Sequence, residues 1–258
     1  MGEEKKELPI DWRTAVVTRL ASPLPAAYPG GASFEVGSLL MISCSGEAGP
    51  LGVVGFVAPS PVALAMNIAH SAAQQAEELK QAFVYADAPS PTGRVKQITV
   101  ASTSYLFDYF EKAMVTVFFS YQALEAFCNE QLLRTSPEGI EVKRKKKKEI
   151  LERREAERQL STSDKLGHVL PKILSIPTMK GKAVWQRFRD LESVRDEVVH
   201  LKNQTVRNND PSKEAEQIFL RLIAEDARSW PRITMEVMEY FVREPIPDWY
   251  KHLKNCVI

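Results

Sequence analysis

The sequence predicts an α+β protein in which a small antiparallel β-sheet with one helix precedes a C-terminal all-α bundle. Two observations predict this class. Short apolar runs separated by turn-forming residues occupy the first hundred positions, and long segments with apolar residues at three- and four-residue spacing follow from about residue 104. We therefore expect an N-terminal region of unknown role over residues 1–103 and a helical bundle over residues 104–258.

The predicted sheet lies in the N-terminal region. Residues 8–33 are rich in proline and glycine and are expected to be extended chain. The apolar runs of residues 34–44 and 51–58 flank a turn-forming cluster at residues 45–50, which indicates a β-hairpin. A third run, residues 94–102, carries β-branched side chains and is expected to add a strand.

One helix is predicted between the hairpin and the third strand, over residues 61–86. Its apolar positions recur at helical spacing. Pro61 suits the first helical turn and Ser60 suits the N-cap. Pro89 and Pro91 end this region.

The C-terminal part is predicted to be entirely helical. The expected helices cover residues 104–134, 142–160, 163–175, 181–202 and 212–243. The first is apolar on most sides, which indicates a central position in the bundle. The third is expected to be capped by Thr162 or Ser163, and the last to be interrupted at Pro231.

Composition narrows the class of protein. The 258 residues carry a formal net charge of +1, from 34 basic and 33 acidic residues, so any nucleic-acid binding must come from local clustering. Three widely spaced cysteines argue against a disulfide framework and for a reducing compartment. The N-terminal sequence lacks the apolar core of a signal peptide, and no run is apolar enough for a membrane span. We expect a cytoplasmic protein with no membrane partner.

Several chemical motifs are missing from the sequence. No Cys-x-x-Cys and no Cys/His cluster is present, so no metal site is expected. Gly49, Gly52 and Gly55 do not match the dinucleotide-binding or P-loop patterns, and no Gly-x-Ser-x-Gly elbow occurs. We therefore expect no cofactor.

The helix of residues 181–202 carries the most informative chemistry. Its core-facing stripe consists of Trp185, Phe188, Leu191, Val194 and Val198. Asp196 and His200 are four residues apart and share a face. Arg195 and His200 are five apart, about 140° around an ideal helix, so they converge only if the helix ends near His200 or a second subunit supplies half of the site. The plainer interpretation is an ion-pair cluster that closes a helix.

The run from Arg195 to His200 resembles the signature of HEPN domains, all-helical modules common in prokaryotic conflict systems. That signature has an arginine, a polar residue, a few further residues and a histidine. The apolar run of residues 118–130, with Leu124, Glu125 and Asn129, is similar to the first core helix of many such domains. The Trp-x-x-Phe-x-x-Leu sequence before Arg195 also suits their motif helix. The resemblance covers roughly residues 104–243, and residues 1–100 have no counterpart.

The resemblance implies a metal-independent endoribonuclease that acts as a homodimer, with two Arg/His motifs forming one composite site. His200 would be the general base or acid for attack of a ribose 2′-hydroxyl on its own phosphate. Arg195 would hold the phosphate, and Asp196 would orient the imidazole. The setting would be a stress, antiphage or toxin–antitoxin system with a cognate neutralising or activating protein. One branch of the family has a modified tyrosine where this chain has Lys202, which counts against silencing by that modification.

Three alternatives stay open. The same fold could serve as a catalytically inactive module that binds nucleic acid or a partner protein. Glu125 and Asn129 either support the Arg/His pair or are buried polar residues satisfied by their neighbours. The basic run either contacts RNA or forms a solvated helix face, with Lys145/Glu149 and Lys148/Glu152 at i,i+4 spacing, and the helix face is favoured. The candidate RNA-contacting residues are Lys143, Arg144, Lys145, Lys146 and Lys202.

Overall fold

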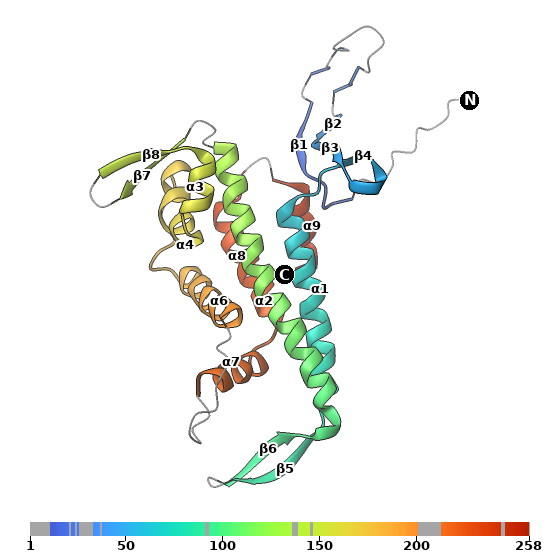
Figure 1. Cartoon of the computed structure of the whole chain (residues 1–258). Coiled ribbons are helices and arrows are strands. Elements are labelled where there is room, and N and C mark those ends of the chain that lie inside the picture. The colour runs from blue at the N-terminus through green and yellow to red at the C-terminus, as the bar shows by residue number, and fades with distance from the viewer. Residues whose placement is uncertain are drawn as a thin grey trace.

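Helices and short antiparallel strands make up the structure, a computed structural model, so the expected α+β class is confirmed (Figure 1). The structure describes residues 11–20, 22–23, 25, 33–36, 38–90, 93–135, 139–144, 147–200, 213–243 and 246–257. None of the described helices combines the length and hydropathy that a membrane span requires.

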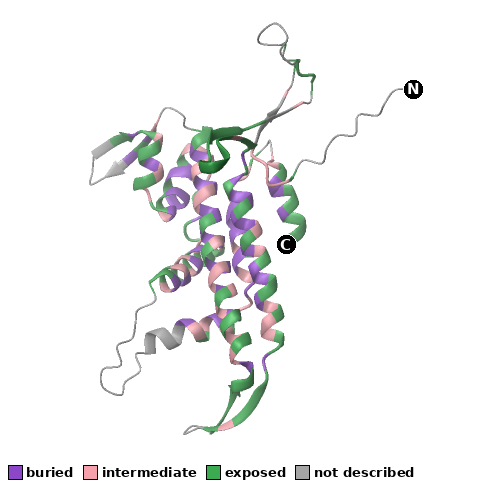
Figure 2. Cartoon of the chain, turned by 45° about the vertical axis from the view of Figure 1, so that its right-hand side comes forward, coloured by how far each residue is buried: buried purple, intermediate pink, exposed green. Residues whose placement is uncertain are grey.

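The helix α2 (Thr103–Thr135) forms the centre of the molecule, as its apolar sequence predicts. Its buried side chains point in several directions, and they include Tyr109, Val117, Leu124 and Phe127. Other helices pack on it from both sides, which the burial colouring shows as purple along the facing surfaces (Figure 2). A helix with this pattern supplies most of one shared core.

The helix α1 (Pro61–Gln81) lies alongside α2 (Figure 1). The predicted cap is confirmed, because the Ser60 hydroxyl accepts a hydrogen bond from the Ala63 amide at 3.3 Å and Pro61 occupies the first turn. The side chains that α1 buries are mostly alanines, so the two helices can approach closely. These two helices lie on either side of the division expected at residue 103, and their side chains share one core.

The β-structure differs from the single small sheet that the sequence predicts, because the strands form separate two-stranded ribbons. A hairpin is present, but its first strand lies later than expected and takes up part of the expected turn: β3 (Ser43–Glu47) pairs with β4 (Val53–Val57). The third expected strand, β6 (Gly93–Ile98), pairs instead with β5 (Tyr85–Ser90). The reason is that α1, roughly 30 Å long, carries the chain to the other end of the molecule between β4 and β5 (Figure 1).

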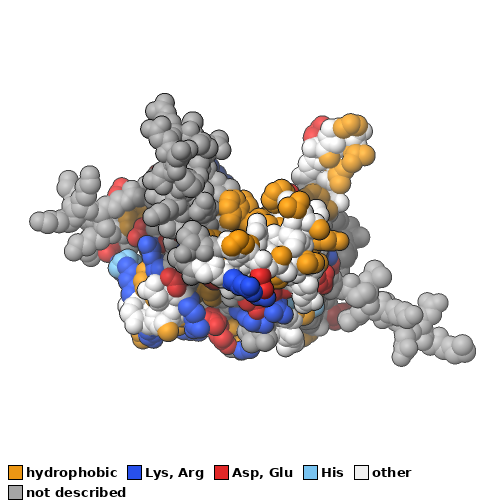
Figure 3. Space-filling view, turned by 90° about the horizontal axis from the view of Figure 1, so that it is seen from below, with side chains coloured by type: hydrophobic (Ala, Val, Ile, Leu, Met, Phe, Trp, Pro, Cys, Tyr) orange, Lys and Arg blue, Asp and Glu red, His pale blue; other side chains and the backbone are white. Residues whose placement is uncertain are grey.

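A further ribbon at the N-terminal end joins β1 (Val16–Arg19) to β2 (Leu39–Met41). Strands β3 and β4 are almost entirely exposed (Figure 2). The opposite end, with β5 and β6, also exposes apolar side chains, and Figure 3 looks onto it. The exposed apolar residues there are Val84, Tyr85, Val95, Val100, Tyr105 and Phe107.

The helix expected over residues 142–160 is wrong. The chain forms a hairpin of β7 (Ile140–Arg144) and β8 (Lys147–Leu151), and only then the helix α3 (Arg153–Gln159). Ile140, Val142 and Leu151 are buried, so the alternation of a strand places apolar side chains against the core. The many charged residues of this segment made the alternation of its apolar residues hard to recognise in the sequence.

This correction changes the interpretation of the basic run. Lys143 is paired in register with Lys148 in the β7–β8 hairpin, so the described part of this segment is not a helix face. The run therefore lies at the end of a ribbon rather than along a helix. Lys145 and Lys146 lie outside the described residues, and for Lys143 and Arg144 the structure describes the backbone only.

The segment expected as a helix over residues 163–175 is helical from Thr162 to Ile173, with an irregular middle. It consists of α4 (Thr162–Asp164), a π-helical turn (Lys165–Val169) and α5 (Leu170–Ile173). The cap is Ser161, one residue before the expected ones, and its hydroxyl accepts a hydrogen bond from the Asp164 amide at 3.0 Å.

The remaining helices are α6 (Ala183–Val199), α7 (Lys213–Ala224), α8 (Ser229–Phe241) and α9 (Asp248–Val257). The expected break at Pro231 is wrong, because the chain leaves the helix at residues 225–228. Pro231 lies in the first turn of α8, where a backbone N–H would have no helical partner anyway. The final helix α9 was not expected.

Substitution of Phe127 tests the central position of α2. Phe127 is 0% exposed, and we expect Phe127→Ala to lower the free energy of unfolding by about 3–5 kcal/mol because it leaves a cavity. The matched control is Phe118→Ala on the same helix, where the ring is 42% exposed and the cost should be about 1 kcal/mol or less. Denaturant unfolding measures both, and equal losses would contradict this description of α2.

The three cysteines should differ in reactivity. Cys128 is buried and burial raises the pKa of its thiol to about 12, whereas Cys44 and Cys256 are exposed. We expect a thiol reagent to modify Cys44 and Cys256 in the folded protein and Cys128 only after unfolding. Mass spectrometry of the labelled protein identifies the sites, and rapid labelling of Cys128 in the folded protein would show that this part of the core is open.

Candidate functional site

The helix α6 positions the Arg/His motif. Four members of its predicted core stripe, Phe188, Leu191, Val194 and Val198, are buried, whereas the fifth, Trp185, is only partly buried. The helix ends at Val199, before the expected limit of residue 202, and the following residue closes it. The motif therefore spans the last helical turn and the first residue beyond it.

His200 stands at this helix end. Its backbone N–H donates to the Asp196 carbonyl oxygen at 3.0 Å, and its φ of −107° and ψ of 39° are no longer helical. Its side chain is exposed. Lys202, a candidate RNA contact, lies outside the described residues. The ideal-helix angle between Arg195 and His200 consequently does not apply.

Arg195 turns from α6 toward α2. Its guanidinium carbon lies 3.9 Å from the centre of the Tyr121 ring, a cation–π contact, and its side chain is 24% exposed. One terminal nitrogen forms an ion pair with the Asp196 carboxylate at 2.8 Å. The buried Nε of Arg195 has no hydrogen-bond partner among the described residues. The guanidinium is thus held in place with donor capacity left over.

A polar network beside Arg195 joins three helices. The Glu192 side chain, 12% exposed, accepts hydrogen bonds from the Tyr121 hydroxyl at 3.1 Å and from the Ser163 hydroxyl at 2.9 Å. Arg189 pairs with Glu192 and donates to the Ser163 hydroxyl oxygen at 2.8 Å. Burial raises the pKa of Tyr121 to about 12, so its hydroxyl keeps its proton as a donor to Glu192 near neutral pH. The Tyr121 ring is therefore held in two ways: its face packs against the Arg195 guanidinium and its hydroxyl donates to Glu192.

Asp196 does not orient the imidazole in this single chain. Its side chain is 55% exposed and its carboxylate pairs with Arg195. No hydrogen bond joins the Asp196 and His200 side chains in the described part of the chain. One chain therefore offers a positioned guanidinium and, separately, an exposed imidazole at the end of the same helix.

Glu125 and Asn129 serve a different cation, Lys165. The Asn129 side-chain oxygen accepts a hydrogen bond from the Lys165 ammonium at 2.8 Å. Glu125, one turn earlier on α2 and half-buried, interacts electrostatically with the same ammonium. These contacts match the alternative of polar residues satisfied by neighbours more closely than direct support of Arg195.

Lys165 is itself a residue that sequence reasoning missed. It is 1% exposed and lies in the π-helical turn, and its ammonium also donates to the Glu157 carbonyl oxygen at 2.8 Å. Burial lowers the pKa of Lys165 from its ordinary value. No sequence signal identifies a buried lysine in this position, because its burial depends on contacts with α2 and α3.

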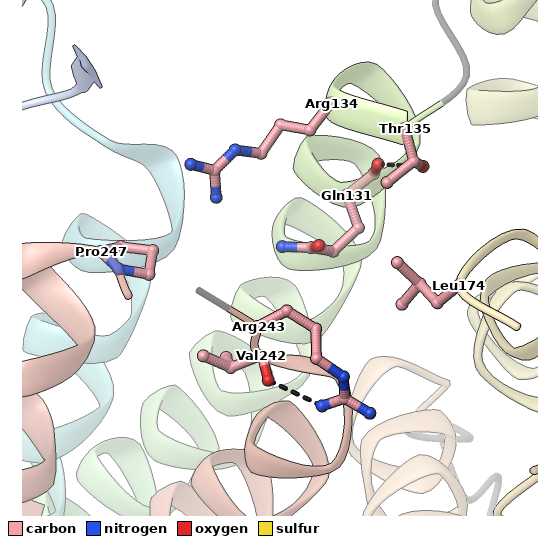
Figure 4. A pocket seen from close by; sticks show the side chains of 7 residues that line it. All are labelled: Gln131, Arg134, Thr135, Leu174, Val242, Arg243 and Pro247. Carbon is pink, nitrogen blue, oxygen red and sulfur yellow. Dashed lines mark hydrogen bonds between the residues drawn. The ribbon is translucent and has the colours of Figure 1, made fainter. Parts of the chain in front are cut away.

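Two surface pockets lie away from the motif, and neither includes Arg195 or His200. One, of about 160 Å³, lies at the end of α2 (Figure 4), and its lining residues are Gln131, Arg134, Thr135, Leu174, Val242, Arg243 and Pro247. Arg134 and Arg243 are on opposite sides with their guanidinium groups pointing apart, so they do not form one anion site (Figure 4). The other is lined by Val184, Arg187, Glu236, Glu239 and Tyr240.

Among the described residues, no group of three or more His, Cys, Asp or Glu side chains is placed to hold a metal ion. Comparison with known proteins gives no relative: no family model, no curated protein and no solved structure matches the chain. The resemblance to HEPN domains therefore stays a prediction.

The other residues that sequence reasoning missed surround Arg195. Tyr121 belongs to the helix that was expected to be apolar on most sides, and Ser163 was expected only as a helix cap. Arg189 and Glu192 are three residues apart on α6, a spacing that could have indicated their ion pair. Their joint role depends on the packing of α2 and α4 against α6, which no local pattern shows.

Paired substitutions test the Lys165 contact. We expect Asn129→Leu to lower the free energy of unfolding by about 1.5–3 kcal/mol, because a buried ammonium loses an acceptor. In the double variant Asn129→Leu/Lys165→Met the cost should be clearly smaller than the sum of the two single costs, since both polar partners are gone. Denaturant unfolding of the four proteins measures this coupling, and additive losses would argue against the hydrogen bond.

Proposed function

We propose that the C-terminal helices form a HEPN-like bundle and that the protein is a metal-independent endoribonuclease of a stress, antiphage or toxin–antitoxin system. The observation that carries the proposal is the placement of Arg195 and His200. The guanidinium is held by Tyr121 and Asp196, and the imidazole stands exposed where α6 ends. A phosphate-binding group and a proton-transfer group thus lie at one end of one helix.

The proposed chemistry is attack of a ribose 2′-hydroxyl on the adjacent phosphorus. His200 takes the proton of the 2′-hydroxyl as general base, or gives one to the leaving 5′-oxygen as general acid. The P–O5′ bond breaks as the new P–O2′ bond forms, which leaves a 2′,3′-cyclic phosphate. Arg195 stabilises the charge that develops on the phosphate oxygens.

A homodimer completes this proposed site. In one chain Arg195 contacts α2 while His200 points to solvent, and the two make no hydrogen bond among the described contacts. A twofold axis near the end of α6 would bring two such pairs onto one substrate. A cognate protein that covers this end of α6 would then neutralise the enzyme.

A second function is a catalytically inactive module that binds nucleic acid or a partner protein. The contacts of Arg195 favour it. Asp196 already neutralises much of the guanidinium charge, and the guanidinium packs on the Tyr121 ring of α2. Such an arginine stabilises the α2–α6 contact without any substrate. The two functions differ in whether RNA is cut.

Cleavage of RNA in the presence of EDTA tests the first function. We expect His200→Ala to lower the cleavage rate by about 10²–10⁴-fold and Arg195→Ala by about 10²–10³-fold, because each removes one catalytic group. The matched control is Arg187→Ala, which removes an exposed arginine of the same helix that pairs with Glu236. Analysis of the product ends should show 2′,3′-cyclic phosphates.

The outcomes separate the two functions. Activity in the parent and in Arg187→Ala, with loss in the two motif variants at equal folded concentration, supports the nuclease. Silence of the parent together with binding of RNA favours the inactive module. Equal cleavage by the parent and by His200→Ala excludes His200 from the reaction. Sedimentation of the parent gives the mass of the particle, and a monomer would rule out the composite site.

A further inference from the structure

Besides the basic run of residues 143–148, positive charge is concentrated in a second segment, residues 165–189, although the whole chain is nearly neutral. The segment contains no aspartate and no glutamate. Its basic residues, besides one histidine, are Lys165, Lys172, Lys180, Lys182, Arg187 and Arg189. This separation of charge along the sequence indicates a local electrostatic role.

Most of these cations have carboxylate or carbonyl partners from elsewhere in the chain, but two do not. Lys172 pairs with Glu141 at 3.0 Å and Arg187 with Glu236 at 2.8 Å. Lys180 and Lys182 are exposed, and neither forms an ion pair with a described residue. These two lysines therefore carry the uncompensated charge of the segment.

The two lysines project from a turn at residues 178–182 that is firmly attached. The Thr178 hydroxyl donates to the Gly167 carbonyl oxygen at 2.8 Å and accepts from the Lys180 amide at 3.2 Å. Met179, which lies between Thr178 and Lys180 in the sequence, is fully buried. Gly181 has a φ of +82°, which other residues adopt only with strain. We call residues 178–182 the lysine turn.

Aromatic rings support both ammonium groups. The Lys180 ammonium lies 5.3 Å from the centre of the Trp185 ring and 2.6 Å from the His168 Nε2. The Lys182 ammonium lies 4.7 Å from the centre of the Tyr240 ring and donates to its hydroxyl oxygen at 2.8 Å. An aromatic ring holds a cation in place but leaves its positive charge, whereas a carboxylate would neutralise that charge. The charges are thus held in place and remain available to an anion.

The lysine turn and the Arg/His motif lie at opposite ends of α6. Trp185, Arg189 and Asp196 follow one side of the helix, and Arg189 is half exposed between the two ends. The distance along α6 from its start to Arg195 is about 18 Å. In Figure 1 the ribbon β7–β8, whose end carries the basic run, lies on the same side of α2 as α3, α4 and α6.

We infer that the lysine turn docks the phosphate backbone of an RNA strand that continues along α6 to the Arg/His motif. Two neighbouring exposed lysines without ion-pair partners suit the closely spaced phosphates of a nucleic-acid strand. The contacts are to phosphates, so recognition here does not depend on base sequence. The inference rests on the proposed function for two of its parts: that the ligand is RNA, and that the strand leads to the Arg/His motif.

Binding of a short, fluorescently labelled 2′-O-methyl RNA strand tests the inference, because this strand cannot be cleaved through its 2′-hydroxyl. We expect Lys180→Gln/Lys182→Gln to weaken binding on the order of tenfold at about 0.1 M salt. The slope of log affinity against log salt should fall by about 1.4, the value for two lost contacts to a single strand. Lys180→Arg/Lys182→Arg should keep most of the affinity, since it keeps both charges.

The matched control is Lys96→Gln/Lys251→Gln, which removes the same charge from exposed lysines of β6 and α9. Circular dichroism confirms that all variants are folded. The inference is overturned if the lysine-turn variant binds like the parent, if the control loses as much affinity, or if the parent does not bind the strand. Lysine-dependent binding to anionic vesicles or to an acidic peptide but not to RNA would also overturn it.

Failure of the inference and failure of the proposed nuclease give different results. The binding assay does not require cleavage. If RNA binding depends on Lys180 and Lys182 but no RNA is cut, the inference holds and the proposed nuclease function is refuted. Cleavage that depends on His200 but is unchanged in the lysine-turn variant removes this inference alone.

Discussion

The wide buried face of α2 is the constraint on which the rest of the structure depends. A helix with apolar side chains on several faces is unstable in water until other elements cover each face. α1 covers one side with alanines, and α6 and α8 cover others. The polar residues of α2 are then buried with the apolar ones, and each requires a partner. The Tyr121 hydroxyl donates to Glu192 and the Asn129 side-chain oxygen accepts from Lys165 for this reason.

Much of the helical part could be predicted from the sequence, because long apolar periodicity survives whatever tertiary contacts form. α2 and α6 follow their stripes, and α1 begins at Pro61 after the Ser60 cap. The segment after residue 139 could not be predicted in this way. Its lysines suit a helix as well as a strand, and only Ile140, Val142 and Leu151 report the strand alternation. The pairing of β5 with β6 followed from the length of α1, which local patterns do not contain.

The candidate site was predictable as a set of residue types and not as a geometry. The position of Arg195 and His200 at the end of a helix followed from periodicity. The partner of Arg195 did not, because Tyr121 comes from a distant helix, and the carboxylate of Asp196 could have served either neighbour. The lysine turn was missed because its two charges have meaning only when their surroundings are known to lack carboxylates. The excess of positive charge in residues 165–189 can be read from the sequence, but the exposure of Lys180 and Lys182 cannot.

The π-helical turn links the buried ammonium of Lys165 to the exposed side chains that follow. Here the Leu170 amide bonds to the Lys165 carbonyl oxygen five residues back, so the turn contains one residue more than a regular helical turn. In a regular α-helix Lys165 and Lys172, which are seven residues or about two turns apart, would share a face, whereas here Lys165 is buried and Lys172 is exposed. The extra residue of the turn therefore separates the inner and outer cations of this region.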